Sequence, residues 1–260
     1  MQTQTIEFSM NQKATALRVK QGIAAEQILT SLALPQPRAL VVLNGGTAQL
    51  DESLQQHLAC AIQDGLARVV AEEQITLITG GTDAGIFQLF GQGRARWGQT
   101  APCIGVAVAD LVPWPGHPQG EAPLESHHSH FVLVEGQNWG DETVTMYTLI
   151  KALAQHRPAI TVFASGGEIA IHEMQANVAQ GRRMIFLAGS GRATDAVLAA
   201  RAGVPSEDAR LQEIAEKGYI VAWSITEPPA ILAALVCRLL GLDAEQSPAE
   251  KASSAQAINE

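Results

Sequence analysis

The stretch VFASGGEIAIHEMQANVAQGRRMIFLAGSGRATDAVLAA (residues 162–200) contains the pattern that decides the fold of this 260-residue chain. An apolar run is followed by a glycine pair and then by a segment with helical spacing. The same order repeats with the run MIFLA, the turn GSGR and a second helical segment. The repeat predicts a strand–helix–strand–helix unit, in which a glycine turn leads from each strand into the next helix.

The rest of the chain extends this alternation in both directions. Short, continuous apolar runs are typical of strands buried on both faces of a sheet, and they occur at residues 39–43, 75–79, 103–107, 131–134, 159–164, 184–188 and 219–223. Segments with helical spacing lie between or after them, at residues 51–72, 85–96, 142–156, 169–179, 192–202, 206–217 and 228–240. We predict an α/β, Rossmann-like, doubly wound fold with a mainly parallel sheet and helices on both faces. A TIM barrel is less suitable, because it needs eight strand–helix units and the sequence shows at most seven.

Length and composition fit one domain over residues 1–242. Residues 1–20 could add an N-terminal hairpin, with strands at 6–10 and 15–19. Residues 110–128 contain four prolines and two glycines, so we expect a long loop after the third strand. Residues 243–260 contain four acidic residues, one lysine and no aromatic residue, and we expect a disordered acidic tail.

The charge balance excludes several classes of partner. The chain has 17 Lys+Arg against 26 Asp+Glu and no basic block, which argues against nucleic acid as a ligand. The longest strongly apolar stretch, residues 230–240, is far shorter than the ~20 residues of a membrane-spanning helix. The N-terminus lacks signal-peptide features and the three cysteines are unclustered, so we expect no membrane association and a cytoplasmic location.

Four apolar runs end in glycine-rich turns that precede helical segments: residues 41–47, 77–85, 162–168 and 186–192. Each turn places flexible backbone beside a helix N-terminus, where N–H groups without partners and the helix dipole favour an anion such as phosphate. Arg192 is the obvious fixed cation. The candidate ligand-binding residues in these turns are Gly45, Gly46, Thr47, Gly80, Gly81, Thr82, Gly166, Gly167, Glu168, Gly189, Ser190, Gly191 and Arg192.

An ordinary tight turn is the competing explanation for any single glycine pair. The chain also lacks the Walker lysine motif and the GxGxxG fingerprint, so the usual phosphate-loop and dinucleotide signatures are absent. Four such turns on one edge of a sheet nevertheless favour a ligand crevice there.

Three segments carry a family resemblance: LITGGTDAGIFQLFGQG (77–93), HHSHFVLVEGQNWG (127–140) and the stretch 162–200. Together they resemble the N-terminal nucleotide-sensing (LSDAT) domain of melastatin-type TRP channels, within the SLOG superfamily, in a prokaryotic-type form without a channel. The resemblance spans residues 40–205. It implies a Rossmann-like fold and a cleft for an ADP-ribose-like or related phosphorylated nucleotide. Residue by residue it points to Thr79, Gly80, Gly81, Asp83, Gly85, Trp139, Gly189, Ser190, Gly191 and Arg192.

The chain departs from this family and from its enzymatic relatives at informative positions. Channel members carry an arginine where the spacing here gives Met146. The LOG phosphoribohydrolases, also called lysine decarboxylase-like proteins, carry PGGxGTxxE, and SGGEIAIHE keeps the glycines and the final Glu173. Their upstream catalytic arginine has only Lys151 as a counterpart. The first hypothesis is therefore a nucleotide sensor, and the alternative is a hydrolase that cleaves an N-glycosidic bond with Glu173 as the catalytic carboxyl.

The remaining titratable groups suggest a structural role. His128 and His130 would point to one face of a strand, but two histidines alone make an incomplete metal site, so we expect no metal and no required cofactor. Glu142, at the start of the helical segment 142–156, is more simply explained as a helix cap than as a catalyst. The expected partner is a small nucleotide, and a homodimer is left open.

Overall fold

The structure, a computed structural model, describes residues 2–8, 12–46 and 52–242. The strands within these residues are β1 (Thr3–Glu7), β2 (Lys13–Val19), β3 (Leu40–Gly45), β4 (Thr76–Thr79), β5 (Cys103–Val108), β6 (His130–Val134), β7 (Ala159–Ala164), β8 (Arg183–Ala188) and β9 (Ile220–Ser224). They form a nine-stranded sheet in the order β1-β2-β6-β5-β4-β3-β7-β8-β9. Only the β1–β2 pair within this sheet is antiparallel, so the predicted Rossmann-like, mainly parallel architecture is confirmed.

The helices lie where the helical spacing predicts them, with one addition. They are α1 (Ala25–Ser31), α2 (Glu52–Ala59), the π-helix η2 (Cys60–Ala67), α3 (Arg68–Glu72), α4 (Gly85–Trp97), α5 (Thr143–Leu153), α6 (Glu168–Ala179), α7 (Arg192–Arg201), α8 (Ala209–Lys217) and α9 (Pro229–Leu240). Over its described residues, 52–72, the predicted segment 51–72 is one helical stretch with a π-helical centre. Within the described part of the chain, no helix has the length and apolar character needed to cross a membrane.

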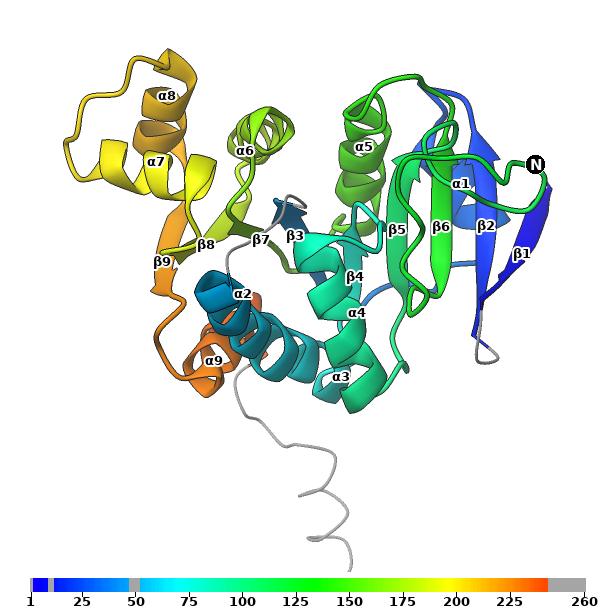
Figure 1. The fold of residues 1–260 in the computed structure, drawn as a ribbon, viewed down its shortest axis with the longest axis horizontal. Helices are drawn as coiled ribbons and strands as arrows, with labels where there is room; N and C mark the ends of the chain where they lie inside the picture. The colour runs from blue at the N-terminus through cyan, green and yellow to red at the C-terminus, as the bar shows by residue number, and fades with distance from the viewer. Residues whose placement is uncertain (1, 9–11, 47–51, 243–260) are drawn as a thin grey trace, which may run out of the picture.

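Strand β3 is buried along nearly all of its length because helices cover both faces of the sheet there. In β3, Val41 and Leu43 face the core formed with α2, η2, α4 and α9, while Leu40 and Val42 face the core formed with α1 and α5. A third core joins β7 and β8 to α6, α7 and α8. Figure 1 shows the two helical layers on either side of the sheet. Each fully buried Leu or Val contributes about 1.5–3 kcal/mol, so alternate residues of one strand stabilise opposite layers.

Two features differ from the sequence prediction. Helix α1 was not predicted; it has seven residues and no side-chain cap at its N-terminus, so its signal in the sequence is weak. The N-terminal strands pair antiparallel as a hairpin would, but the first spans Thr3–Glu7 rather than 6–10. Strand β2 also pairs in parallel with β6, which makes the hairpin part of the main sheet. Residues 9–11 of the hairpin and the expected tail at 243–260 lie outside the described residues.

The strand order fixes the place of a ligand crevice. From β3 the chain proceeds to β4, β5 and β6 on one side, and then returns to add β7, β8 and β9 on the other side. The switch in direction falls between β3 and β7. In open α/β sheets, the crevice lies outside the carboxyl ends of the strands at such a switch point. The glycine turns after β3, β4 and β7 therefore lie at or next to this crevice.

Candidate functional site

A pocket of about 450 Å³ lies at the carboxyl edge of the sheet, over the ends of β3 and β4 and beside α5 and α6. It combines backbone from two glycine turns with side chains from the long loop and the two helices. Five of the residues predicted from sequence line it: Gly45, Gly80, Thr82, Trp139 and Glu173. The other lining residues are Ala84, Phe87, Glu121, Ala122, Glu142, Met146 and Ile169.

The turn after β4 presents backbone donors to this pocket. The N–H groups of Gly80, Thr82 and Ala84 have no hydrogen-bond partner among the described residues, and all three residues line the pocket. The turn then enters α4, a helix of 13 residues, so the helix dipole adds positive potential at the same place. These donors could bind an anion or a carbonyl oxygen of a ligand.

Gly81 shapes the turn rather than the pocket. Its φ is +74°, and a Cβ there would lie 2.8 Å from the Cα of Gly105 and 3.1 Å from the Phe131 ring. Its N–H is bonded to Thr79 Oγ1 at 2.8 Å. A larger residue at position 81 would therefore disturb the fold of the turn itself.

The turns after β3 and β7 contact each other. The Gly46 N–H donates to the Ala164 carbonyl at 2.9 Å, and a Cβ on Gly45 would overlap the same carbonyl. The N–H groups of Gly166 and Gly167 have no hydrogen-bond partner in the described residues. They precede α6, a helix of 12 residues, and so form a second set of free donors at a helix N-terminus.

The turn after β8 has its own internal anion. The Gly189 and Gly191 N–H groups donate to the two carboxylate oxygens of Asp195 at 2.9 and 2.8 Å. Ser190 is buried, and its hydroxyl accepts the Ser165 N–H at 2.7 Å. These three residues remain candidate contacts, but most of their polar groups already have partners within the chain.

Arg192 is the exception in that turn. Its guanidinium is exposed, and its Nη2 lies 3.1 Å from the position that a Cβ on Gly167 would occupy. The Arg192 side chain has no hydrogen bond or ion pair among the described residues. A free guanidinium thus lies beside the free N–H groups of the Gly166–Gly167 turn, which is a suitable pair of donors for phosphate.

Two buried carboxyl groups, Glu142 and Glu173, line the pocket. Burial raises the pKa of Glu173 well above its usual value, and the nearby Glu142 charge raises it further. Burial also raises the pKa of Glu142, although its carboxylate accepts the Gly140 N–H at 2.8 Å. Glu142 stands at the N-cap position of α5, but its side chain makes no capping hydrogen bond to that helix, so the expected capping role is wrong. The carboxylate bonds the preceding Gly140 N–H instead and lines the pocket. Burial therefore favours the protonated form of both carboxyl groups.

Trp139 forms a wall of the pocket together with the long loop. Its Nε1 donates to Glu121 at 2.8 Å, which brings a third carboxyl group to the pocket lining. None of the lining residues is Lys, Arg or His. Met146, at the position where channel members carry arginine, also lines the pocket. The interior is thus acidic and apolar, and the nearest free cation of the glycine turns, Arg192, is not among its lining residues.

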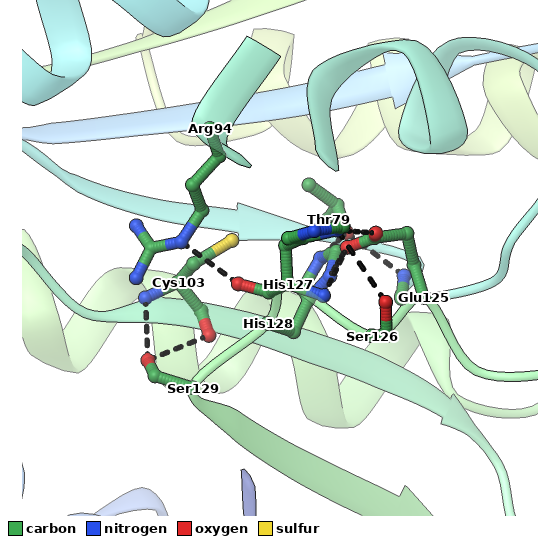
Figure 2. Close-up of polar contacts among 9 residues, drawn as sticks. Thr79, Arg94, Cys103, Glu125, Ser126, His127, His128 and Ser129 are labelled. Carbon is green, nitrogen blue, oxygen red and sulfur yellow. Dashed lines mark hydrogen bonds and ion pairs between the residues drawn. The ribbon is translucent and has the colours of Figure 1, made fainter. Parts of the chain in front are cut away.

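His127 and His128 belong to a buried polar network beneath the turn after β4 (Figure 2). His128 Nε2 lies 2.7 Å from Thr79 Oγ1, and His128 Nδ1 lies 2.8 Å from a carboxylate oxygen of Glu125. The other oxygen of Glu125 lies 2.6 Å from His127 Nδ1. Burial alone would lower the pKa of His128, but the Cys103 sulfur and the Glu125 carboxylate outweigh burial and raise it to about 9. His128 is therefore an imidazolium at neutral pH. The histidines could be singled out from the sequence, but no sequence pattern predicted that Glu125 pairs with them.

Several predicted residues lie away from the pocket lining. Thr79 is fully buried below the turn. The Asp83 side chain is exposed, and its N–H is bonded to the Pro123 carbonyl. Glu168 is exposed and paired with Arg210. Gly85 begins α4 with a φ of +50°, and Thr47 lies outside the described residues. No group of three or more His, Cys, Asp or Glu side chains within the described part of the chain could hold a metal ion.

Comparison with known proteins identifies the family. Residues 38–233 match the family described as "SLOG in TRPM, prokaryote". The chain is also 26% identical over 236 residues to transient receptor potential cation channel subfamily M member 2 of Rattus norvegicus, and 26% identical over 223 residues to that of Mus musculus. These matches cover 75% and 71% of this chain, but only 15% and 14% of the channels.

The fold and the glycine turns at its carboxyl edge define an α/β domain of the Rossmann-like type. The chain belongs to the prokaryotic SLOG family related to TRPM channels, because the match covers most of its length. The chain spans about one seventh of the length of the two channels.

The His128 imidazolium makes stability depend on pH. Its folded pKa of about 9 lies above the ordinary value of 6.5, so its contribution is complete below pH 6.5 and is lost as the pH rises through about 9. Urea unfolding should show His128→Gln less stable than wild type by about 1–3 kcal/mol at pH 6.5, with a much smaller difference above pH 9. His57→Gln, at an exposed position on α2, should show no such trend. A difference that does not change with pH would contradict the ionised state of His128.

Proposed function

We propose that this domain binds a phosphorylated nucleotide of the ADP-ribose type and acts as its sensor. The observation that carries the proposal is the pair of free N–H sets, at the Gly80–Ala84 turn and at the Gly166–Gly167 turn, next to one pocket at the switch point of the sheet. Family membership supports it, because the matching family is described as SLOG in TRPM, and the sequence resembles the nucleotide-sensing domain of these channels.

The charges around the pocket suggest how such a ligand is oriented. Glu121, Glu142 and Glu173 line the interior without any basic lining residue, so a phosphate there would be repelled. Ribose hydroxyls and base amino groups are hydrogen-bond donors and suit carboxyl acceptors. The nucleoside end would therefore enter the pocket, where the N–H groups of Gly80, Thr82 and Ala84 could bond its oxygen atoms. The phosphates would bind outside the pocket, at the free N–H groups of the Gly166–Gly167 turn and at Arg192.

Arg192→Ala tests the phosphate end of this arrangement. By isothermal titration calorimetry, the variant should bind ADP-ribose about 10- to 150-fold more weakly, which corresponds to about 1.5–3 kcal/mol for a hydrogen bond to a charged group. Its melting temperature without ligand should stay close to that of wild type, because the side chain is exposed and has no partner in the described residues.

Arg157→Ala is the matched control, since Arg157 is also exposed but precedes β7 at the opposite edge of the sheet. It should bind ADP-ribose with wild-type affinity. Equal losses in the two variants would indicate a general charge effect, and no loss in Arg192→Ala would remove that side chain from the site.

A second candidate function, hydrolysis of an N-glycosidic bond, is favoured by the pair of buried carboxyls. A protonated Glu173 could give its proton to the departing base while water adds to the ribose C1′, and an ionised Glu142 could accept the proton of that water. The arrangement lacks a cation, because Lys151 is exposed at the end of α5 and does not line the pocket.

Release of a free base separates the two functions. The purified chain, incubated with nucleoside monophosphates, NAD and ADP-ribose, should leave them intact by chromatography if it is a sensor. Base release that falls at least 100-fold in Glu173→Gln, but not in Glu168→Gln on the exposed side of the same helix, would establish the hydrolase instead.

A further inference from the structure

The turn after β4 is fixed from below by a fully buried hydroxyl. Thr79 ends β4 and has no exposed surface, so its side chain does not reach the pocket. Its oxygen accepts the Gly81 N–H at 2.8 Å and contacts His128 Nε2 at 2.7 Å. With His128 protonated, both acceptor positions of this oxygen are used to hold the turn.

The His128 ring is in turn fixed by Glu125. The Glu125 carboxylate accepts from His128 Nδ1 at 2.8 Å and from the His127 backbone N–H at 3.0 Å. Helix α4 makes room for this carboxylate at Gly91, where any Cβ would overlap it. The carboxylate, the imidazolium and the hydroxyl therefore form one chain of hydrogen bonds that ends at the backbone of the turn (Figure 2).

The same segment also joins two walls of the pocket. The Glu125 N–H donates to the Gly81 carbonyl at 2.9 Å, and the Asp83 N–H donates to the Pro123 carbonyl at 2.8 Å. Just before this point, the long loop contributes Glu121 and Ala122 to the pocket lining. The position of the turn relative to the long loop thus depends on contacts around Glu125.

We propose that Thr79, His128 and Glu125 are positioning residues of the nucleotide site, which aim the free N–H groups of the Gly80–Ala84 turn into the pocket. None of the three touches the ligand; they act through the backbone of the turn. This inference rests on the proposed function, but it predicts the geometry of the turn whether or not a ligand is bound.

A pair of substitutions at position 79 tests the role of the hydroxyl. Thr79→Val keeps the shape of the side chain and removes the oxygen, whereas Thr79→Ser keeps the oxygen. We expect Thr79→Val to bind ADP-ribose at least tenfold more weakly by calorimetry, and Thr79→Ser to bind within twofold of wild type. Ser129→Ala is the control, because it removes a neighbouring hydroxyl whose bonds, among the described residues, go to the Cys103 backbone and to His130 rather than to the turn.

Amide hydrogen exchange without ligand gives a second readout that does not depend on the proposed function. The bonded N–H groups of Gly81 and Asp83 should exchange at least tenfold faster in Thr79→Val and in Glu125→Gln, and at the wild-type rate in Ser129→Ala. Glu125→Gln takes the place of Thr79→Val if that variant does not fold.

The outcomes are distinct. Unchanged exchange and unchanged affinity in Thr79→Val would overturn the positioning role, as would equal loss of affinity in Ser129→Ala. If wild type does not bind ADP-ribose while exchange in the turn accelerates as expected, the proposed function fails and the control of the turn by Thr79 and Glu125 stands.

Discussion

The backbone N–H groups at the carboxyl edge of the parallel sheet are the constraint on which the site depends. Within the sheet, the backbone N–H and C=O groups of paired strands bond each other. Each turn from a strand into a helix, by contrast, leaves N–H donors without partners in the helix. This chain deals with them in three ways. The Gly46 N–H bonds a neighbouring carbonyl, and the Gly189 and Gly191 N–H groups bond the Asp195 carboxylate. The N–H groups of Gly80 and Gly166 have no partner within the part of the chain that the structure describes. The free ones lie beside the pocket and the crevice.

Charge is divided across this edge in a way that composition alone does not reveal. The chain is acidic overall, yet three carboxyl groups gather in one pocket lining while a guanidinium lies outside it. An acidic interior, with Arg192 and the Gly166–Gly167 N–H groups outside it, would select a ligand with hydroxyl groups at one end and phosphate at the other. Glu142 belongs to this division because it both bonds a backbone N–H next to its helix and lines the pocket.

The strands could be predicted well from the sequence, because a strand buried on both faces has a continuous apolar run, such as that of β3. Turn glycines such as Gly45 and Gly80 were also visible. What it could not predict depends on contacts between distant segments: the Glu125–His128 pair beneath the turn and the occupation of Gly189 and Gly191 by Asp195. No local sequence pattern distinguishes a glycine N–H that is free to bind a ligand from one that is hydrogen-bonded within the chain.

The Asp195 carboxylate determines whether the N–H groups of the turn after β8 are available to a ligand. In the Gly189–Gly191 turn, the carboxylate of Asp195, four residues after Gly191, accepts the N–H groups that could otherwise bind an anionic ligand. With a neutral, non-accepting residue in place of Asp195, the Gly189 and Gly191 N–H groups would lose these two acceptors. The glycines of this turn therefore do not by themselves indicate a free anion site, because the chain supplies the anion.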